Sequence, residues 1–221
     1  MKQLHTTRFS IVLLAVGLIL SLSACDDSNP VDAEDPVELE VKTVEDLPAD
    51  PLVSTGQGRP SGTGYYTFFS LRDGEIVLSY DAESRADSAS TAWDIALQGT
   101  TIRVNGGTSG PGNGAAYVAE AAFEEVAEVN LNQLQPDSKS ALAIPQGSGN
   151  GWYNYSGPPN HVISPIPGRT IVVRTADGDG YAKIRIVSYY EGAPSDPAES
   201  DADSRHYTFE YVYQPDGASF E

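Results

Sequence analysis

Residues 205–213 read RHYTFEYVY, a regular alternation of polar and aromatic side chains. Successive side chains of a β-strand point to opposite faces, so every second residue shares a face. One face of this segment carries four aromatic rings, from Tyr207, Phe209, Tyr211 and Tyr213. The other face carries His206, Thr208 and Glu210. The segment therefore predicts a β-strand whose aromatic face lies in a core and whose polar face meets solvent or a neighbouring strand.

The chain beyond about residue 51 repeats this pattern of short strands and turns. Tyr, Ile, Val and Thr gather in short runs that Gly, Pro, Asn and Asp interrupt. Ala115–Val129 fits a helix through its Ala and Glu content and a strand through its alternation, and we expect a strand followed by a short turn. About 170 residues are enough for one core, so the sequence predicts a single all-β domain, an antiparallel β-sandwich, over residues 51–221. The other expected extended segments are residues 65–71 with 75–80, 93–104, and 171–175 with 181–190.

The first 24 residues indicate an export signal. Lys2 and Arg8 give it a positive start, and the apolar run Ile11–Leu22 would be about 18 Å long as a helix, too short for a hydrocarbon core of about 30 Å. The run ends in residues 22–25, LSAC, which resemble the lipobox of bacterial lipoproteins. That resemblance implies a diacylglycerol on the thiol of Cys25 and cleavage before it. The alternative is an ordinary signal peptide with a chance cysteine. Cys25 is the only cysteine, so no internal disulfide is expected.

Residues 26–50 are rich in acid and proline and poor in aromatics, which is typical of a solvated tether. The expected organisation is a signal peptide at 1–24, a lipidated acidic tether at 25–50 and the β domain at 51–221. The pair Asp26-Asp27 resembles the acidic signals that follow the lipid cysteine in surface-displayed lipoproteins of the Bacteroidota. In proteobacterial systems an aspartate there indicates inner-membrane retention instead. We expect an outer-membrane, lipid-anchored protein on the cell surface, with the periplasmic face as the alternative.

The charge of the chain argues against anionic partners. Loss of Lys2 and Arg8 with the signal would lower the basic residues from 13 to 11 against 31 acidic ones, a net charge of −20. Such a surface repels phosphate backbones and anionic lipid headgroups. Nucleic-acid binding is therefore not expected, and contact with the membrane is expected through the lipid alone.

Residues 93–117 read WDIALQGTTIRVNGGTSGPGNGAAY. This block of Trp-Asp-Ile-Ala, a short strand and a glycine-rich segment resembles the HmuY family of Bacteroidota lipoproteins. The hairpin at 171–190 and the tyrosine-rich last strand agree with it, and the resemblance covers about residues 64–213. It implies an all-β domain of the HmuY type. It also implies a carrier that binds haem b and passes it to a TonB-dependent outer-membrane receptor.

The resemblance further implies two axial side chains on the haem iron, histidines in the founding type and methionines in some relatives. This sequence departs from that pattern. Its only methionine is Met1, and His5 would be lost with the signal, so only His161 and His206 remain. A bis-methionine site is therefore impossible, and a bis-histidine site would need both histidines.

His161 follows an aromatic, turn-rich segment at 152–160, WYNYSGPPN. Apolar ring faces beside an unprotonated imidazole suit a porphyrin, whose iron takes the nitrogen lone pair. His161 is therefore the first candidate iron ligand and His206 the second. The other candidate haem-binding residues are Trp152, Tyr153 and Tyr155, either tyrosine being able to supply a phenolate. The alternative is a loop histidine without a ligand, beside aromatic residues that only cap the core.

Motifs for other chemistry are incomplete. The glycines at 106–114 lack the Gly-Lys-Ser/Thr ending of a phosphate loop. Asp177-Gly178-Asp179-Gly180 suggests a calcium loop, but the twelfth position is Ser188 rather than glutamate, so a hairpin turn is expected. No hydrolase or zinc-protease motif occurs, so no enzyme is expected. The alternative to a haem carrier is a non-haem interaction or adhesion lipoprotein of the cell surface that keeps the scaffold without the axial ligands.

Overall fold

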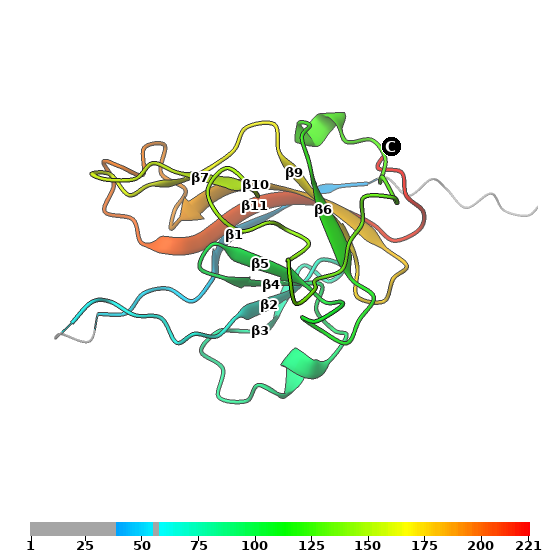
Figure 1. Cartoon of the computed structure of the whole chain (residues 1–221), viewed down its shortest axis with the longest axis horizontal. Coiled ribbons are helices and arrows are strands. Elements are labelled where there is room, and N and C mark those ends of the chain that lie inside the picture. The colour runs from blue at the N-terminus through cyan, green and yellow to red at the C-terminus, as the bar shows by residue number, and fades with distance from the viewer. Residues whose placement is uncertain (1–38, 55–57) are drawn as a thin grey trace, which may run out of the picture. The chain divides into compact units, whose positions relative to one another are not determined.

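The computed structural model describes residues 39–54 and 58–221, so the signal peptide, Cys25 and the first part of the tether lie outside it. The predicted aromatic strand is β11, Ser204–Gln214. It lies in a five-stranded antiparallel sheet of order β1-β11-β10-β9-β6 (Figure 1). The other strands of this sheet are β1 (Val41–Pro48), β6 (Ala115–Ala119), β9 (Thr170–Arg174) and β10 (Tyr181–Tyr190).

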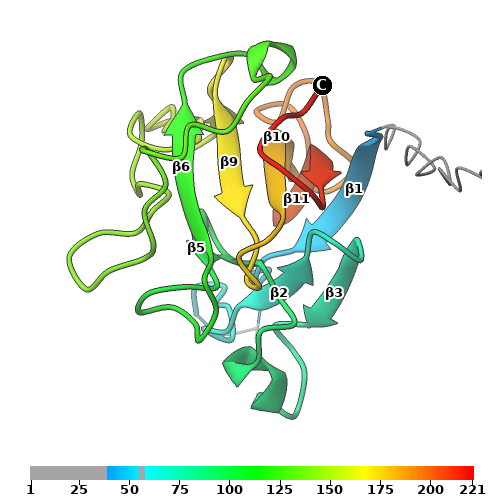
Figure 2. The same cartoon turned by 90° about the vertical axis from the view of Figure 1, so that its right-hand side faces the viewer.

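A second sheet of four antiparallel strands lies against the first, as Figure 2 shows, in the order β3-β2-β4-β5. Its strands are β2 (Thr67–Ser70), β3 (Glu75–Leu78), β4 (Ile95–Gln98) and β5 (Thr101–Val104). The remaining elements are the two-stranded pair β7 (Tyr153–Tyr155) and β8 (Ile163–Pro165), and the 3₁₀ turns η1 (Ala86–Ala89) and η2 (Phe123–Glu125). None of the helical turns in the described residues is long and apolar enough to span a bilayer.

The core lies between the two sheets and confirms the all-β prediction. Tyr207, Phe209 and Tyr211 are at most 1% exposed, as the alternation predicts. Phe209 meets Phe69 of β2 edge to face at 5.6 Å between ring centroids, a favoured aromatic arrangement.

The hairpin predicted at 65–80 is β2–β3, and the segment at 115–129 is a strand followed by a 3₁₀ turn. The stretch at 93–104 is a hairpin rather than one strand, because Gly99 turns the chain with φ +52°.

Ordered structure begins before the predicted boundary after Asp50, because β1 lies within the segment predicted as a tether. Residues 41–48 form β1 and pair with β11, and the side chain of Leu47 is 2% exposed. Among the acidic residues of the predicted tether that the structure describes, Glu45 is exposed on this edge strand, whereas Asp50 is 2% exposed. Composition alone therefore placed the end of the tether too late.

The outer face of the five-stranded sheet is also partly covered. Lys183 of β10 is 7% exposed because η2 and the C-terminal segment lie over it. Its Nζ donates to the carbonyl of Val126 at 2.9 Å and lies 4.9 Å from the ring centroid of Phe123 and 5.3 Å from that of Phe220. Burial lowers the pKa of Lys183. A second, smaller hydrophobic cluster thus closes this side of the sheet.

The block at residues 93–117 joins the two sheets. Asp94 is 5% exposed, and its carboxylate accepts from the backbone N–H of Leu71, which follows β2, and of Ala176, which follows β9, each at 2.8 Å. Burial raises the pKa of Asp94, and the two backbone donors oppose that shift only in part. One carboxylate therefore connects a turn of each sheet.

Asn105 organises the glycine-rich segment that follows. Its Nδ2 donates to the carbonyl of Trp93 at 2.8 Å, and its Oδ1 accepts from Gly112 N–H at 3.0 Å. A Cβ at Gly110 would overlap Asn105 Oδ1 and lie 2.8 Å from Trp93 Cζ2, closer than side chains pack. The glycines therefore allow the backbone to pack against the Trp93–Asn105 contact, which is a structural role.

Asp50 fixes the loop before β2 and gives the fold a pH dependence. Its carboxylate accepts from Thr63 N–H at 2.6 Å, Thr63 Oγ1 at 2.8 Å and Gly64 N–H at 3.0 Å, with Arg205 at 3.8 Å. Burial raises the pKa of Asp50, but these donors and the Arg205 charge outweigh it and hold the pKa below the ordinary 3.8. A lowered folded pKa stabilises the fold above about pH 4, and this contribution is lost as the pH falls.

Replacing Asp50 with asparagine is expected to cost about 1 kcal/mol near neutral pH, because the charge of the acceptor is lost. The difference from wild type should shrink as the pH falls below about 4, where the wild-type carboxylate becomes protonated. Urea unfolding at several pH values between 3 and 7 measures it. Asp201→Asn, at an exposed position, is the control and should change nothing. A wild-type advantage that grows on acidification would contradict this role of Asp50.

Candidate functional site

The hairpin β7–β8 and its turn carry three of the sequence-predicted residues, Tyr153, Tyr155 and His161. Tyr153–Tyr155 pair with Ile163–Pro165, and the connecting turn closes where Ser156 N–H donates to Val162 O and His161 N–H to Gly157 O, each at 2.9 Å. Ile163 N–H donates to the hydroxyl of Tyr190 at 3.0 Å, which fixes the hairpin to the end of β10. His161 therefore lies in an exposed turn held by an anchored hairpin.

His161 and Tyr155 contact each other on this hairpin. Both side chains are exposed, their ring centroids are 5.9 Å apart, and the phenolic hydroxyl is hydrogen-bonded to Nδ1 of the imidazole. A partner on one ring nitrogen fixes the orientation of a histidine and leaves Nε2 for a metal. The backbone of His161 has φ +54°, a left-handed conformation that non-glycine residues adopt uncommonly. This imidazole is thus oriented, exposed and free at Nε2 among the described residues.

Trp152 and Tyr153 lie beneath the hairpin and belong to the core. They are 3% and 8% exposed, and Trp152 Nε1 donates to the carbonyl of Thr100 at 3.1 Å. The indole packs against Tyr207 and Tyr189, with centroid distances of 5.2 and 5.9 Å. These rings support the hairpin, and Trp152 also lines the hollow beside β8 that is described below.

His206 comes from a different sheet. It lies on β11 opposite Pro48 of β1, on the strand face of Thr208 and Glu210, as the alternation predicts. Its Nδ1 is buried and has no hydrogen-bond partner among the described residues. The structure therefore places Tyr155 in contact with His161, whereas His161 and His206 belong to different structural elements.

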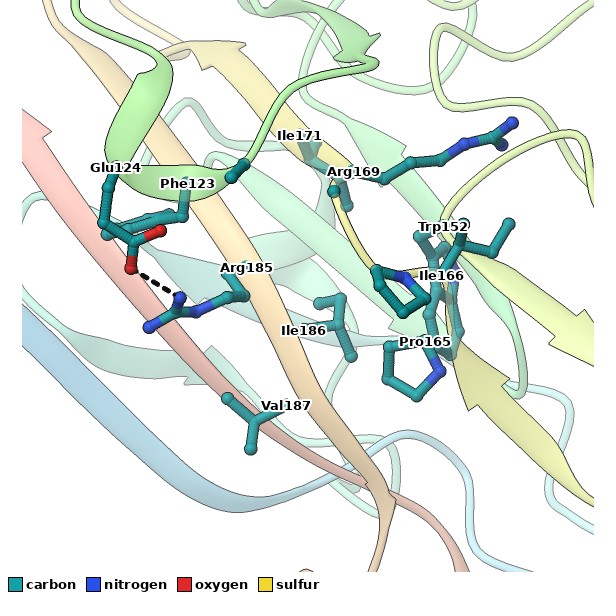
Figure 3. A pocket seen from close by; sticks show the side chains of 13 residues that line it. Phe123, Glu124, Trp152, Pro165, Ile166, Arg169, Ile171, Arg185, Ile186 and Val187 are labelled. Carbon is teal, nitrogen blue, oxygen red and sulfur yellow. Dashed lines mark hydrogen bonds and ion pairs between the residues drawn. The ribbon is translucent and has the colours of Figure 1, made fainter.

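A shallow hollow that the sequence did not predict lies where the chain leaves β8 and crosses β10 (Figure 3). Its volume is about 260 Å³, and its apolar lining includes Pro165, Ile186 and Val187. Arg185 at its rim is held by Glu124 and Glu210, and the hydrogen bond to Glu210 raises the pKa of the guanidinium. Such a site is smaller than the usual range for small-molecule pockets, so it accommodates part of a ligand.

Arg169, on the other side of this hollow, is less fully paired. It donates to the carbonyl of Gly151, and its only carboxylate partner in the described residues is Glu120 at 3.4 Å, whose side chain is 83% exposed. An exposed partner of this kind exchanges readily with a ligand carboxylate. No group of three or more His, Cys, Asp or Glu side chains within residues 39–54 and 58–221 is placed to hold a bare metal ion.

The family model described as HmuY protein matches residues 63–211. The chain belongs to the HmuY family. The matched region contains the Trp93–Asn105 block, the β7–β8 hairpin with His161, and most of β11. The predicted family is thereby confirmed over well more than half of the chain.

Comparison with solved structures gives a distant HmuY relative. The apo HmuY analogue of Tannerella forsythia is 18% identical, with 80% of this chain and 96% of that chain covered and a TM-score of 0.41. No protein of curated function matches the chain significantly. The assignment to the HmuY family therefore rests on the match of the family model.

Proposed function

We propose that this chain is a haem- or porphyrin-binding carrier of the bacterial cell envelope. The HmuY family is associated with haem binding, which is a binding function rather than catalysis. The observation that carries the proposal is His161, an exposed imidazole whose Nδ1 is engaged by Tyr155. In the tautomer in which Nδ1–H donates to the Tyr155 hydroxyl, Nε2 would offer its lone pair to haem iron.

Residues at the base of the β7–β8 hairpin, the end away from the turn that carries His161, suit the rest of a porphyrin. Arg169, whose carboxylate partner is exposed, supplies a cation for a propionate group. The apolar hollow beside β8, with Pro165 and Val187, supplies a surface for part of the macrocycle. His206 remains the second candidate ligand, because its Nδ1 lacks a partner among the described residues. Tyr155 acts on the imidazole, so we assign it an orienting role rather than direct iron ligation.

The exposure of this region favours a haem carrier over a haem-storage protein. A ligand held at an exposed turn can be handed to another protein without unfolding the β-sandwich, because the hairpin is a separate two-stranded element. We propose a TonB-dependent outer-membrane receptor as the recipient. Lipid at Cys25 would keep the carrier at the outer membrane, on the cell surface, with the acidic segment before β1 as the tether.

A titration of the purified protein with haemin tests the proposal. We expect a shifted Soret band that saturates at one haemin per chain, in the ferric state, the ferrous state or both. Absence of a shift in both redox states would reject haem binding.

The second candidate is an interaction or adhesion protein of the cell surface that has lost haem. It is favoured by the scarcity of axial ligands and by the origin of His161 and His206 in different sheets. This candidate predicts that replacing both histidines leaves partner capture in pull-down experiments unchanged. Haemin saturation at one site would favour the carrier instead.

A further inference from the structure

A second hollow lies on the opposite side of β5 from the core and has a different chemistry. It is about 330 Å³ in volume and is formed by the end of β5, the glycine-rich segment and the loop at residues 138–146. Its lining is almost entirely polar. Two cations and four hydroxyl side chains contribute most of it, from Arg103, Lys139, Thr108, Ser109, Ser138 and Ser140.

Neither cation of this hollow has a carboxylate as an ion-pair partner among the described residues. The ion pairs found in residues 39–54 and 58–221 involve Arg72, Arg169, Arg185 and Arg205, and none involves Arg103 or Lys139. Acidic residues outnumber basic ones 31 to 13 in the whole chain, so carboxylates are abundant. Two cations without ion-pair partners in a single hollow therefore form a local exception to an acidic surface.

Arg103 is positioned in advance of any ligand. Its guanidinium lies over the ring of Tyr66, 4.5 Å from the centroid, which fixes the plane of the group. Its Nε is buried and has no hydrogen-bond partner among the described residues. Because Nε is buried, a ligand in the hollow would be contacted by the terminal nitrogens of the guanidinium.

The loop that carries Lys139 is also fixed. Asp137 is 1% exposed, and its carboxylate accepts from Val104 N–H at 3.1 Å and from Ala143 N–H at 2.8 Å, which holds both ends of the loop against β5. The Ser138 hydroxyl donates to the carbonyl of Ala141 at 2.9 Å and closes the turn between them. The negative charge of Asp137 is thus turned into the protein and bound by backbone donors. The lining of the hollow remains cationic and hydroxylic.

We infer that this hollow binds a small ligand that carries a phosphate or sulfate monoester together with hydroxyl groups. Planar guanidinium and ammonium groups are the side chains that recognise such oxyanions, and the hydroxyls on the walls suit a polyol such as a saccharide. The volume lies within the usual range for a small-molecule site. The site is separate from the β7–β8 hairpin, so its test does not depend on whether the protein binds haem.

Calorimetric titration of the purified protein with inorganic phosphate, inorganic sulfate, glucose 6-phosphate and glucose tests the inference. We expect the charged ligands to bind, glucose 6-phosphate to bind more tightly than inorganic phosphate, and glucose not to bind. Arg103→Gln and Lys139→Gln should each weaken glucose 6-phosphate binding by about tenfold or more, because each removes a charge-assisted contact. Arg59→Gln removes an exposed cation elsewhere and should leave the affinity unchanged.

Two variants, Arg103→Gln and Lys139→Gln, are needed so that loss of binding can be separated from loss of the fold. Should Arg103→Gln destabilise the fold, as unfolding curves would reveal, the exposed Lys139→Gln still reports on the site. Binding to vesicles with and without phosphatidic acid distinguishes a lipid headgroup from a soluble ester as the ligand. Arg103-dependent binding to the vesicles that contain phosphatidic acid would support the site, with a lipid headgroup as the ligand. Equal binding of glucose and glucose 6-phosphate, binding unaffected by either variant, or no binding of any probe would overturn the inference.

Discussion

Replacement of Asp94 with alanine is expected to destabilise the domain by about 4 kcal/mol, a large part of the 5–15 kcal/mol typical of a folded domain. The carboxylate is the acceptor for two backbone N–H groups, of Leu71 and Ala176, that follow strands of different sheets. Alanine would leave both donors without a partner at a position where the side chain is 5% exposed. Each unsatisfied buried donor costs about 1–3 kcal/mol, and the two costs add to the loss of the contact between the sheets.

Chemical denaturation of the variants measures this effect. Asp94→Asn is expected to lie between wild type and Asp94→Ala, because its amide oxygen can serve only one of the two donors and its NH₂ group faces the other. Asp179→Ala, in the exposed turn between β9 and β10, is the matched control and should cost well under 1 kcal/mol. An Asp94→Ala protein as stable as the Asp179→Ala protein would contradict the role of Asp94 as the connection between the sheets.

Replacement of His161 with glycine is expected to weaken haemin binding by roughly 100-fold. Loss of a group that only orients a metal ligand weakens binding by about 10- to 100-fold, and loss of the ligand itself should have at least the upper value. Glycine is the suitable replacement because the backbone at residue 161 has φ +54°, which glycine adopts without strain. The substitution thus removes the imidazole and leaves the hairpin conformation accessible. Haemin titration followed at the Soret band gives the dissociation constants.

Two further variants separate the candidate roles. Tyr155→Phe removes the hydroxyl that engages His161 Nδ1 and should weaken binding by a smaller factor than His161→Gly. His206→Ala tests the second candidate ligand: an effect as large as that of His161→Gly indicates ligation by both histidines. Unchanged affinity in both His161→Gly and His206→Ala would exclude histidine ligation in this chain.

Much of the fold could be predicted from local sequence patterns. The aromatic alternation at 205–213 predicted the buried face of β11, and the paired extended segments at 65–71 and 75–80 predicted the β2–β3 hairpin. Both features depend on residues adjacent in the chain. The strand at 41–48 escaped prediction because it lies in a longer segment rich in acid and proline, and only the pairing with distant β11 makes Leu47 a core residue.

The candidate sites depend more on distant contacts. His161 could be singled out from its aromatic surroundings, but the burial of Trp152 and Tyr153 could not, because it arises from packing against Tyr207 and Tyr189. The cationic hollow combines Arg103 of β5 with a loop more than thirty residues later, which Asp137 holds in place. No local pattern connects those positions, so only the folded chain reveals them.

The most direct test of the central claim is imidazole rescue of the His161→Gly protein loaded with haemin. If His161 is an axial ligand, the variant should have an altered absorption spectrum, and added imidazole, free to occupy the vacated coordination position, should restore the wild-type spectrum. Identical spectra of wild type and variant before imidazole is added would contradict the claim that this exposed histidine binds the haem iron.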